Sequence, residues 1–267
     1  MKKQTILLFF ALCCLGIAAC KKNSSDPQAS FEENVKIAMS ETLAGTKRTL
    51  VFKCMTEKSY PCINYFLETS HAVTNSKITI NFIQVTGPNI CLTAVGPAST
   101  VIELDELSGE TKDYGLELNF GGLTVTGQLS ISGTSYKATI PAQTKVQFVN
   151  PVLGRIPDNT VFGTVHYHFA STAATVQKFT DSLQYYGATS ALYPPGDYLM
   201  FQIDANGQIK QTQDQGYYFT RYYIFNYSSD ITNLKNLVYR YGKSKPDSLL
   251  ATLNTSKGET FYSWAPK

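Results

Sequence analysis

Two histidines separated by one residue, His166 and His168, have the spacing of a metal site. In a β-strand, residues two positions apart lie on the same face, so both imidazoles would point the same way. Such a pair binds zinc when a third protein ligand arrives from a neighbouring strand. His71, the third histidine of the chain, or a carboxylate would have to supply that ligand. Two donors do not make a zinc site, so we keep His166 and His168 as metal candidates and expect no metal or other cofactor.

The chain lacks the local patterns that activate a nucleophile or hold a phosphate. It contains no Gly-x-Ser-x-Gly motif. The pair Gly121-Gly122 precedes an expected strand, whereas a phosphate loop precedes a helix. Residues 204–207 (DANG) resemble the start of a calcium loop without its closing glutamate, so they predict a plain turn. We therefore expect a protein that is not an enzyme.

Tyrosine is the unusual feature of the composition, since 13 of the 17 tyrosines follow residue 150. Adjacent residues of a strand point to opposite faces, so pairs such as Tyr222-Tyr223 cannot be wholly buried when helices cover only one face. An exposed tyrosine ring has an apolar body and a polar tip, which suits binding of glycans or proteins. Aromatic residues also populate strands because they pack well there. We select Tyr218, Tyr222 and Tyr223 as candidate partner-binding residues.

The first twenty residues have the order of a secretory signal. Lys2 and Lys3 precede an apolar run at residues 6–19, which is shorter than the roughly 20 residues of a membrane-spanning helix. The ending Ile17-Ala18-Ala19-Cys20 resembles the lipobox of bacterial lipoproteins. This resemblance implies that residues 1–19 are a signal peptide and that acylated Cys20 anchors the protein in a lipid bilayer.

The residues around the anchor indicate a location in the cell envelope. Lys21 stands where an aspartate retains lipoproteins in the inner membrane of enteric bacteria, so by analogy we expect an outer membrane lipoprotein. Residues 20–30 are polar and contain Pro27, which predicts a flexible stalk. Residues 1–19 carry two lysines and no acidic residue, so their removal lowers the formal net charge from +3 to +1. A nearly neutral chain has no general reason to bind nucleic acid.

The cysteines fit an oxidising compartment. Once Cys20 and the two cysteines of the apolar run are set aside, three remain, so at most one disulfide forms. We favour Cys62–Cys91, whose loop closure is worth about 3–4 kcal/mol. Cys54–Cys62 is the alternative, and spacing alone leaves both open.

Two segments, each of which contains one cysteine of this pair, resemble a known pattern. Residues 60–65 (YPCINY) and 91–98 (CLTAVGPA) are similar to segments of uncharacterised lipoproteins of the Bacteroidota. The similarity covers roughly residues 31–140 and implies no activity. It supports the Cys62–Cys91 pairing.

Residues 31–145 predict a β-sandwich domain that begins with a short helix. Phe31, Val35 and Met39 have near-helical spacing, which predicts a helix at residues 31–43. From residue 49 to about 140, apolar residues alternate with polar ones in short segments separated by Gly and Pro turns. This period of two predicts antiparallel strands that pack as a sandwich.

Residues 155–267 contain two similar units, displaced by 55 positions. Each unit has a strand, a helix that ends in Tyr-Gly, at Tyr186-Gly187 and Tyr241-Gly242, and a second strand. The first unit runs through strands at 161–169 and 198–203, and the second through strands at 217–227 and 248–253. Two βαβ units joined by a hairpin predict a ferredoxin-like α+β domain, with both helices on one face of the sheet.

These features predict a lipid-anchored envelope protein whose open, tyrosine-bearing sheet face binds a polysaccharide or another envelope protein. A metal-dependent envelope enzyme centred on His166 and His168 is the alternative. A purely structural spacer is the third hypothesis, and it predicts no ligand at all.

Overall fold

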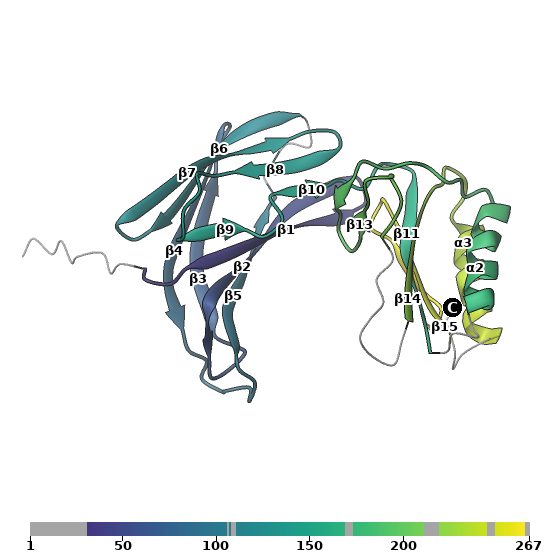
Figure 1. Cartoon of the computed structure of the whole chain (residues 1–267), viewed down its shortest axis with the longest axis horizontal. Helices are drawn as coiled ribbons and strands as arrows, with labels where there is room; N and C mark the ends of the chain where they lie inside the picture. Colours follow the sequence, from purple (N-terminus) through teal and green to yellow (C-terminus); the bar gives the residue numbers. More distant parts are fainter. Residues whose placement is uncertain are drawn as a thin grey trace, which may run out of the picture.

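The computed structural model describes residues 31–105, 107, 111–168, 173–210, 219–244 and 249–264. These residues form a mainly β structure with two sheets and two helices (Figure 1). A large mixed sheet of twelve strands curls around its own core. Beside it stands a four-stranded antiparallel sheet, with both helices on the face that is turned away from the large sheet.

The large sheet is formed mainly by the first half of the chain. Its strand order is β13-β12-β10-β8-β7-β6-β4-β3-β5-β2-β1-β9. Four of its pairs, β1–β9, β3–β5, β4–β6 and β10–β12, are parallel, so the expectation of purely antiparallel pairing is wrong. Its strands are β1 (Val35–Ala44), β2 (Lys47–Tyr60), β3 (Phe66–Val73), β4 (Lys77–Thr86), β5 (Gly96–Leu104), β6 (Lys112–Phe120), β7 (Leu123–Ile131), β8 (Ser135–Thr139), β9 (Val146–Phe148), β10 (Val152–Gly154), β12 (Gly196–Asp197) and β13 (Gln202–Ile203).

Strand β1 replaces the helix that we predicted at residues 31–43. Val35, Ile37 and Met39 are buried and alternate with half-buried neighbours, which is the period of a strand. Glu41 continues the buried series at 2% exposure. The helix prediction was wrong because a charged residue at a core position hid the alternation.

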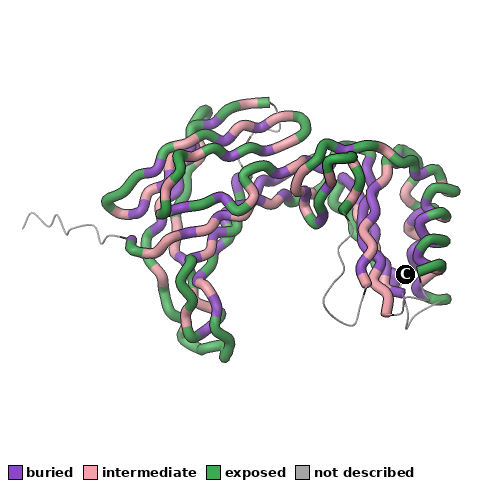
Figure 2. The backbone as a smooth tube through the Cα atoms, viewed as in Figure 1, coloured by how far each residue is buried: buried purple, intermediate pink, exposed green. Residues whose placement is uncertain are grey.

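A single apolar core fills the inside of the curl. The rings of Phe82 and Phe120 stack with centroids 4.6 Å apart, and Phe31 packs against both. Figure 2 shows the alternation along the strands, where buried and more exposed residues follow one another. Each large apolar side chain buried in this way contributes about 1.5–3 kcal/mol.

Asn150 and Pro151 connect two strands of the large sheet that are far apart in the strand order, β1 and β8. The side-chain amide of Asn150 pairs with both backbone groups of Met39 on β1, because Met39 N–H donates to Oδ1 at 2.7 Å and Nδ2 donates to Met39 O at 2.8 Å. The next residue, Pro151, accepts a hydrogen bond from Ala138 N on β8 at 2.8 Å. The segment between β9 and β10 is therefore bonded to β1 near one end of the strand order and to β8 near the other, which holds the sheet in its curled form.

The disulfide prediction is confirmed. Cys62, in the turn after β2, is bonded to Cys91, in the loop before β5, across a sequence separation of 29. Cys54 is a free thiol that is fully buried in the large core. Burial raises the pKa of the Cys54 thiol to about 12, so the reactive thiolate is scarce at neutral pH.

Replacing Cys62 and Cys91 by serine is expected to lower the free energy of unfolding by about 3 kcal/mol, because the unfolded chain regains the entropy of a 29-residue loop. Urea denaturation measures this loss. Reduction should shift the wild type to the midpoint of the double variant and leave the double variant unchanged. A double variant as stable as the oxidised wild type would contradict the prediction.

The small sheet has the strand order β14-β11-β15-β16. Both predicted helices are present, and α2 buries Val176, Phe179 and Leu183, while α3 buries Leu234, Leu237 and Val238. Neither helix in the described part of the chain is long and apolar enough to cross a membrane. The elements are β11 (Thr160–Tyr167), α2 (Ala173–Tyr185), β14 (Phe219–Asn226), α3 (Thr232–Ser244), β15 (Leu249–Thr255) and β16 (Thr260–Tyr262).

We predicted that the second helix would end at Gly242, but α3 continues to Ser244. A Cβ atom at Gly242 would lie 1.8 Å from the backbone oxygen of Ser263. The glycine is therefore required for close packing of the helix on the chain after β16, and it does not mark the end of the helix.

The chain between α2 and β14 departs from the predicted repeat. The strand expected at residues 198–203 is absent from the small sheet, because β12 and β13 extend the large sheet instead. Tyr198 and Phe201, from the same segment, pack with Phe162 and Ile224 on the face of the small sheet opposite the helices. The expectation of an open sheet face is therefore wrong for this part of the sheet, and β14 is left at a sheet edge.

Candidate functional site

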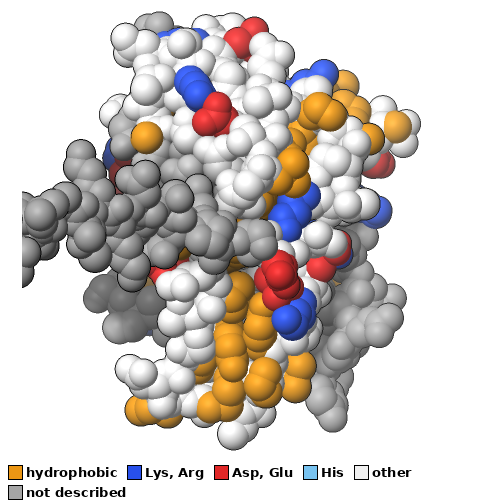
Figure 3. Space-filling model, turned by 90° about the vertical axis from the view of Figure 1, so that its left-hand side faces the viewer, with side chains coloured by type: hydrophobic (Ala, Val, Ile, Leu, Met, Phe, Trp, Pro, Cys, Tyr) orange, Lys and Arg blue, Asp and Glu red, His pale blue; other side chains and the backbone are white. Residues whose placement is uncertain are grey.

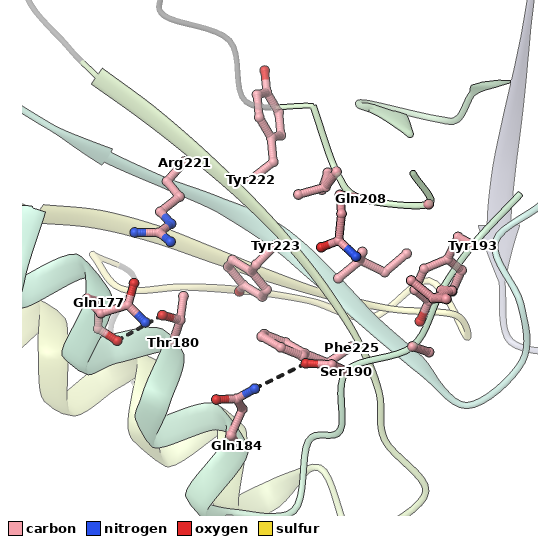
Figure 4. A pocket seen from close by; sticks show the side chains of 15 residues that line it. Gln177, Thr180, Gln184, Ser190, Tyr193, Gln208, Arg221, Tyr222, Tyr223 and Phe225 are labelled. Carbon is pink, nitrogen blue, oxygen red and sulfur yellow. Dashed lines mark hydrogen bonds between the residues drawn. The ribbon is translucent and has the colours of Figure 1, made fainter. Parts of the chain in front are cut away.

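A groove with a volume of about 380 Å³ lies along the edge of β14 (Figure 4). One wall is helix α2, and the floor is formed by residues 221–225 of β14. The opposite wall comes from residues 190–193 and 207–209, in the segment that connects α2 to the large sheet and back. The departure from the predicted repeat thus creates the groove, since a strand paired with this edge would occupy the same place.

The helix wall of the groove presents uncharged hydrogen-bonding groups. Gln177, Thr180 and Gln184 lie three and four residues apart, so they form one stripe along α2. Gln184 Nε2 donates to Ser190 Oγ at 3.2 Å and joins the two walls, as the dashed line in Figure 4 shows. Among the described residues, no hydrogen bond uses the side-chain oxygen of Gln177 or Gln184. Each amide therefore keeps an acceptor, and a second donor N–H, for a ligand.

Tyr222 and Tyr223 both line the groove but belong to opposite faces of β14. Figure 4 shows Tyr222 pointing away from the helix wall and Tyr223 pointing toward it. Tyr222 is half-buried and also lines a second cavity, of about 350 Å³, against residues 38–40 of β1. Of the predicted partner-binding residues, Tyr222 is therefore the one that lies at a cavity and remains partly exposed.

Tyr223 is a core residue, and its burial removes it from the exposed surface that we predicted. Its side chain is 3% exposed, and its ring packs edge-to-face on Phe179 of α2 with centroids 5.8 Å apart. Its hydroxyl donates to Thr252 O on β15, across the intervening strand β11. Burial raises the pKa of Tyr223 above its usual value, so the hydroxyl remains a donor. Tyr218 and Cys20 lie outside the described residues.

The histidine pair does not meet a third ligand in the described part of the chain. His166 Nδ1 lies 2.9 Å from Thr220 Oγ1, and His166 Nε2 lies 3.1 Å from Thr164 Oγ1. His71 lies on β3 of the large sheet. No group of three His, Cys, Asp or Glu side chains suited to a metal ion occurs among the described residues. The structure thus brings His166 together with hydroxyl groups, where it completes a hydrogen-bonded strip across the sheet.

The charged part of the groove is small. Arg221 supplies one cation from β14, and Asp181 accepts a hydrogen bond from Gln177 Nε2 at 2.7 Å at the helix wall. One cation and one nearby carboxylate leave the lining close to neutral. The groove is therefore suited to a neutral polar ligand and not to a highly charged one.

Sequence reasoning missed most of the groove. Gln177 and Gln184 are seven residues apart on one helix, so a polar stripe was detectable. No pattern showed that Ser190 and Gln208 would face that stripe, because their position depends on the path of the chain toward the large sheet. Comparison of the chain with protein-family models, curated proteins and solved structures gave no match. The interpretation of the groove therefore rests on its own geometry and chemistry.

Proposed function

We propose that the chain is a lipid-anchored envelope protein that binds a carbohydrate in the groove beside β14 and catalyses no reaction. The observation that carries the proposal is the lining, in which the amides of Gln177 and Gln184 face a wall that contains Tyr193 and Gln208. Sugar hydroxyl groups both donate and accept hydrogen bonds, which matches amide side chains. The C–H faces of a sugar ring pack against aromatic rings, and Tyr222 supplies one at the end of the groove.

The size of the groove limits the ligand to a short glycan segment. Its volume of about 380 Å³ is near the lower end of the range for ligand sites, about 300–1,000 Å³. We propose that the groove holds the end or a side branch of an envelope polysaccharide. An extended internal segment would need the second cavity beside Tyr222 as well.

The arrangement of the small sheet supports a modified ferredoxin-like fold. Strands β14 and β15 run parallel on either side of β11 and are connected through α3, which is one split βαβ unit. We propose that the first unit, formed by β11 and α2, has lost its outer strand to the large sheet, whose two halves face each other across one core as in a sandwich. In this interpretation the lost strand left the space that the ligand occupies.

A glycan array followed by titration calorimetry tests the proposed function. The double variant Gln177→Ala/Gln184→Ala is expected to bind the retained glycan roughly 5- to 150-fold more weakly, because each of the two lost neutral hydrogen bonds costs about 0.5–1.5 kcal/mol. Gln84→Ala is the matched control, since Gln84 is an exposed glutamine on β4 of the large sheet. Retention of no glycan by the wild type, or equal affinity in the double variant, would overturn the proposal.

A further inference from the structure

An uncharged, apolar tip projects from one end of the large sheet, at the bottom of Figure 1. The tip consists of residues 60–66, which follow β2, and residues 87–96, which precede or begin β5. No charged residue occurs at positions 59–67 or 78–102. The Cys62–Cys91 disulfide joins the two segments, and Asn64 adds hydrogen bonds to Ile90 O at 2.8 Å and from Leu92 N at 3.2 Å. The tip is therefore a fixed structure.

The tip exposes large apolar side chains to solvent. Ile90 is 78% exposed and Val95 is 74% exposed, and about half of each side chain is exposed at Ile63, Phe66 and Leu92. Figure 3 shows hydrophobic side chains gathered in the lower half of the face of the large sheet. Exposed apolar groups that cluster in this way mark a surface that binds a protein or a membrane.

The base of the tip has the residue types found where proteins meet the surface of a membrane. Tyr60 and Tyr65 stack with ring centroids 4.6 Å apart, and Lys58 Nζ lies 5.3 Å from the centre of the Tyr60 ring. Tyrosine is enriched at the boundary between hydrocarbon and water, and lysine keeps its charged end in water. Along β2, Lys58 precedes Tyr60, whose partner Gly96 is the last residue of the ladder with β5 before the exposed side chains of Ile90, Leu92 and Val95. The order from lysine through tyrosine to apolar side chains follows the polarity gradient of a bilayer surface. Phe66, which is paired with Ser99 opposite Met55, lies behind this end.

The chain enters the fold close to the tip, so the tip can reach the bilayer in which the expected lipid anchor is inserted. Lys58 Nζ lies 2.9 Å from Glu33, and Glu57 N donates to Asn34 O at 2.9 Å, so the chain enters the fold next to the end of β2. Cys62 lies four residues beyond Lys58, which is about 13 Å along a strand. Residues 21–30 between the expected anchor and the fold span at most about 36 Å when extended. A chain anchored at Cys20 therefore has enough length for the tip to touch the bilayer.

We propose that the apolar tip inserts into the surface layer of the lipid bilayer and orients the protein on it. The proposal builds on the anchor of the proposed function but requires contacts of its own. The end of the tip carries no charge and exposes four large apolar side chains, Ile63, Ile90, Leu92 and Val95. They fit the acyl boundary of a lipid surface, where binding grows with the apolar area that is buried. Insertion by this end of the large sheet leaves the small sheet and its groove on a separate part of the molecule (Figure 1).

Quenching of tryptophan fluorescence by brominated phosphatidylcholine tests the insertion. The full chain is purified from cells that acylate lipoproteins and is reconstituted into phosphatidylcholine vesicles. The wild type has one tryptophan, Trp264, after β16 of the small sheet, and sets the baseline. Ile90→Trp should lose at least twofold more fluorescence than the wild type. Asn75→Trp is the control, because Asn75 lies in the turn at the opposite end of β3 and β4 and should stay at the baseline.

The outcomes distinguish insertion of the tip into lipid from its use as a contact between two copies of the chain. Equal quenching of Ile90→Trp and Asn75→Trp on vesicles that carry the protein would overturn insertion. A dimer in sedimentation velocity that Ile90→Asn abolishes, without quenching, would assign the tip to a second copy of the chain and also overturn insertion. A Cys20→Ser series separates the anchor from the tip. If Cys20→Ser does not change flotation with vesicles while Ile90→Trp is still quenched, the anchor fails and the tip stands.

Discussion

Glu41→Gln is expected to lower the free energy of unfolding by about 3–5 kcal/mol, because it removes a buried negative charge that faces the buried Arg155 and the half-buried Arg48. The carboxylate of Glu41 is 1% exposed. Arg48 Nη1 lies 3.3 Å from both of its oxygens, and Arg155 Nε lies 3.7 Å from Oε1. An amide at this position retains an acceptor but no charge, so both guanidinium groups would lose the compensating charge of Glu41.

Tyr136 adds a hydrogen bond and a ring contact to the cluster of charged residues around Glu41. Its hydroxyl donates to Glu41 Oε1 at 2.9 Å, and the guanidinium carbon of Arg155 lies 5.2 Å from the centre of the Tyr136 ring. Burial and the neighbouring Glu41 charge raise the pKa of Tyr136, so its hydroxyl keeps its proton. The cluster thus joins β1 and β8 of the large sheet to the residues after β10 that lead into the small sheet.

Thermal and urea unfolding of Glu41→Gln measure the predicted loss. Glu103→Gln is the control, since Glu103 is an exposed glutamate on β5, and it should change stability by no more than about 0.5 kcal/mol. A loss below about 1 kcal/mol in Glu41→Gln would show that the cluster does not depend on the charge of Glu41. Arg48 retains an ion pair with Asp158 at 2.9 Å, which limits the loss to the range given.

Many of the helices and strands of this fold were predictable, because the period of their apolar residues can be seen within a short stretch of sequence. The alternation at residues 49–140 and the existence of two amphipathic helices, α2 and α3, follow from spacing, whereas β1 was predicted as a helix. Glu41 marks the limit of that reasoning. A charged residue is expected at the surface, and only the arrangement of Arg48, Arg155 and Tyr136 around it makes the buried position favourable.

The site was less predictable because it depends on which sheet accepts a two-residue strand. The sequence predicts a strand at residues 198–203, but nothing in its alternation selects one sheet over the other. The packing of Tyr198 and Phe201 against Phe162 accompanies the choice of the large sheet, and it joins residues about 40 positions apart. The groove beside β14 is a consequence of that choice, so neighbouring residues alone carried no pattern for it.

Gly163→Ala is expected to lower the free energy of unfolding by about 2–4 kcal/mol. A Cβ atom at this position of β11 would lie 2.0 Å from the backbone oxygen of Thr252 and 2.8 Å from the hydroxyl of Tyr223. The backbone oxygen cannot rotate away, so strands β11 and β15 would have to separate. Overpacking of this kind costs about 1–3 kcal/mol, and loss of the Tyr223 hydrogen bond adds about 1 kcal/mol or more.

Gly163 also explains how Tyr223 reaches its hydrogen-bond partner. The two residues are directly paired in the β11–β14 ladder, and Thr252 lies on the strand beyond β11. Without a side chain at Gly163, the tyrosine ring crosses β11 and its hydroxyl reaches Thr252 O. Because Tyr223 also lines the groove, displacement of its ring by Gly163→Ala should weaken glycan binding in the fraction of protein that remains folded.

Two variants separate steric overlap from the loss of the hydrogen bond. Gly115→Ala alters a strand glycine of β6 whose Cβ would be 3.6 Å from the nearest atom, Ser76 O, and it should leave stability unchanged or raise it by up to about 1 kcal/mol. Tyr223→Phe keeps the ring and removes only the hydroxyl, so its loss should be about 1–3 kcal/mol. In urea unfolding, Gly163→Ala should have a lower free energy of unfolding than either of these two variants. If Gly163→Ala lost no more stability than Gly115→Ala, the close approach of β11 and β15 would not be required for the fold.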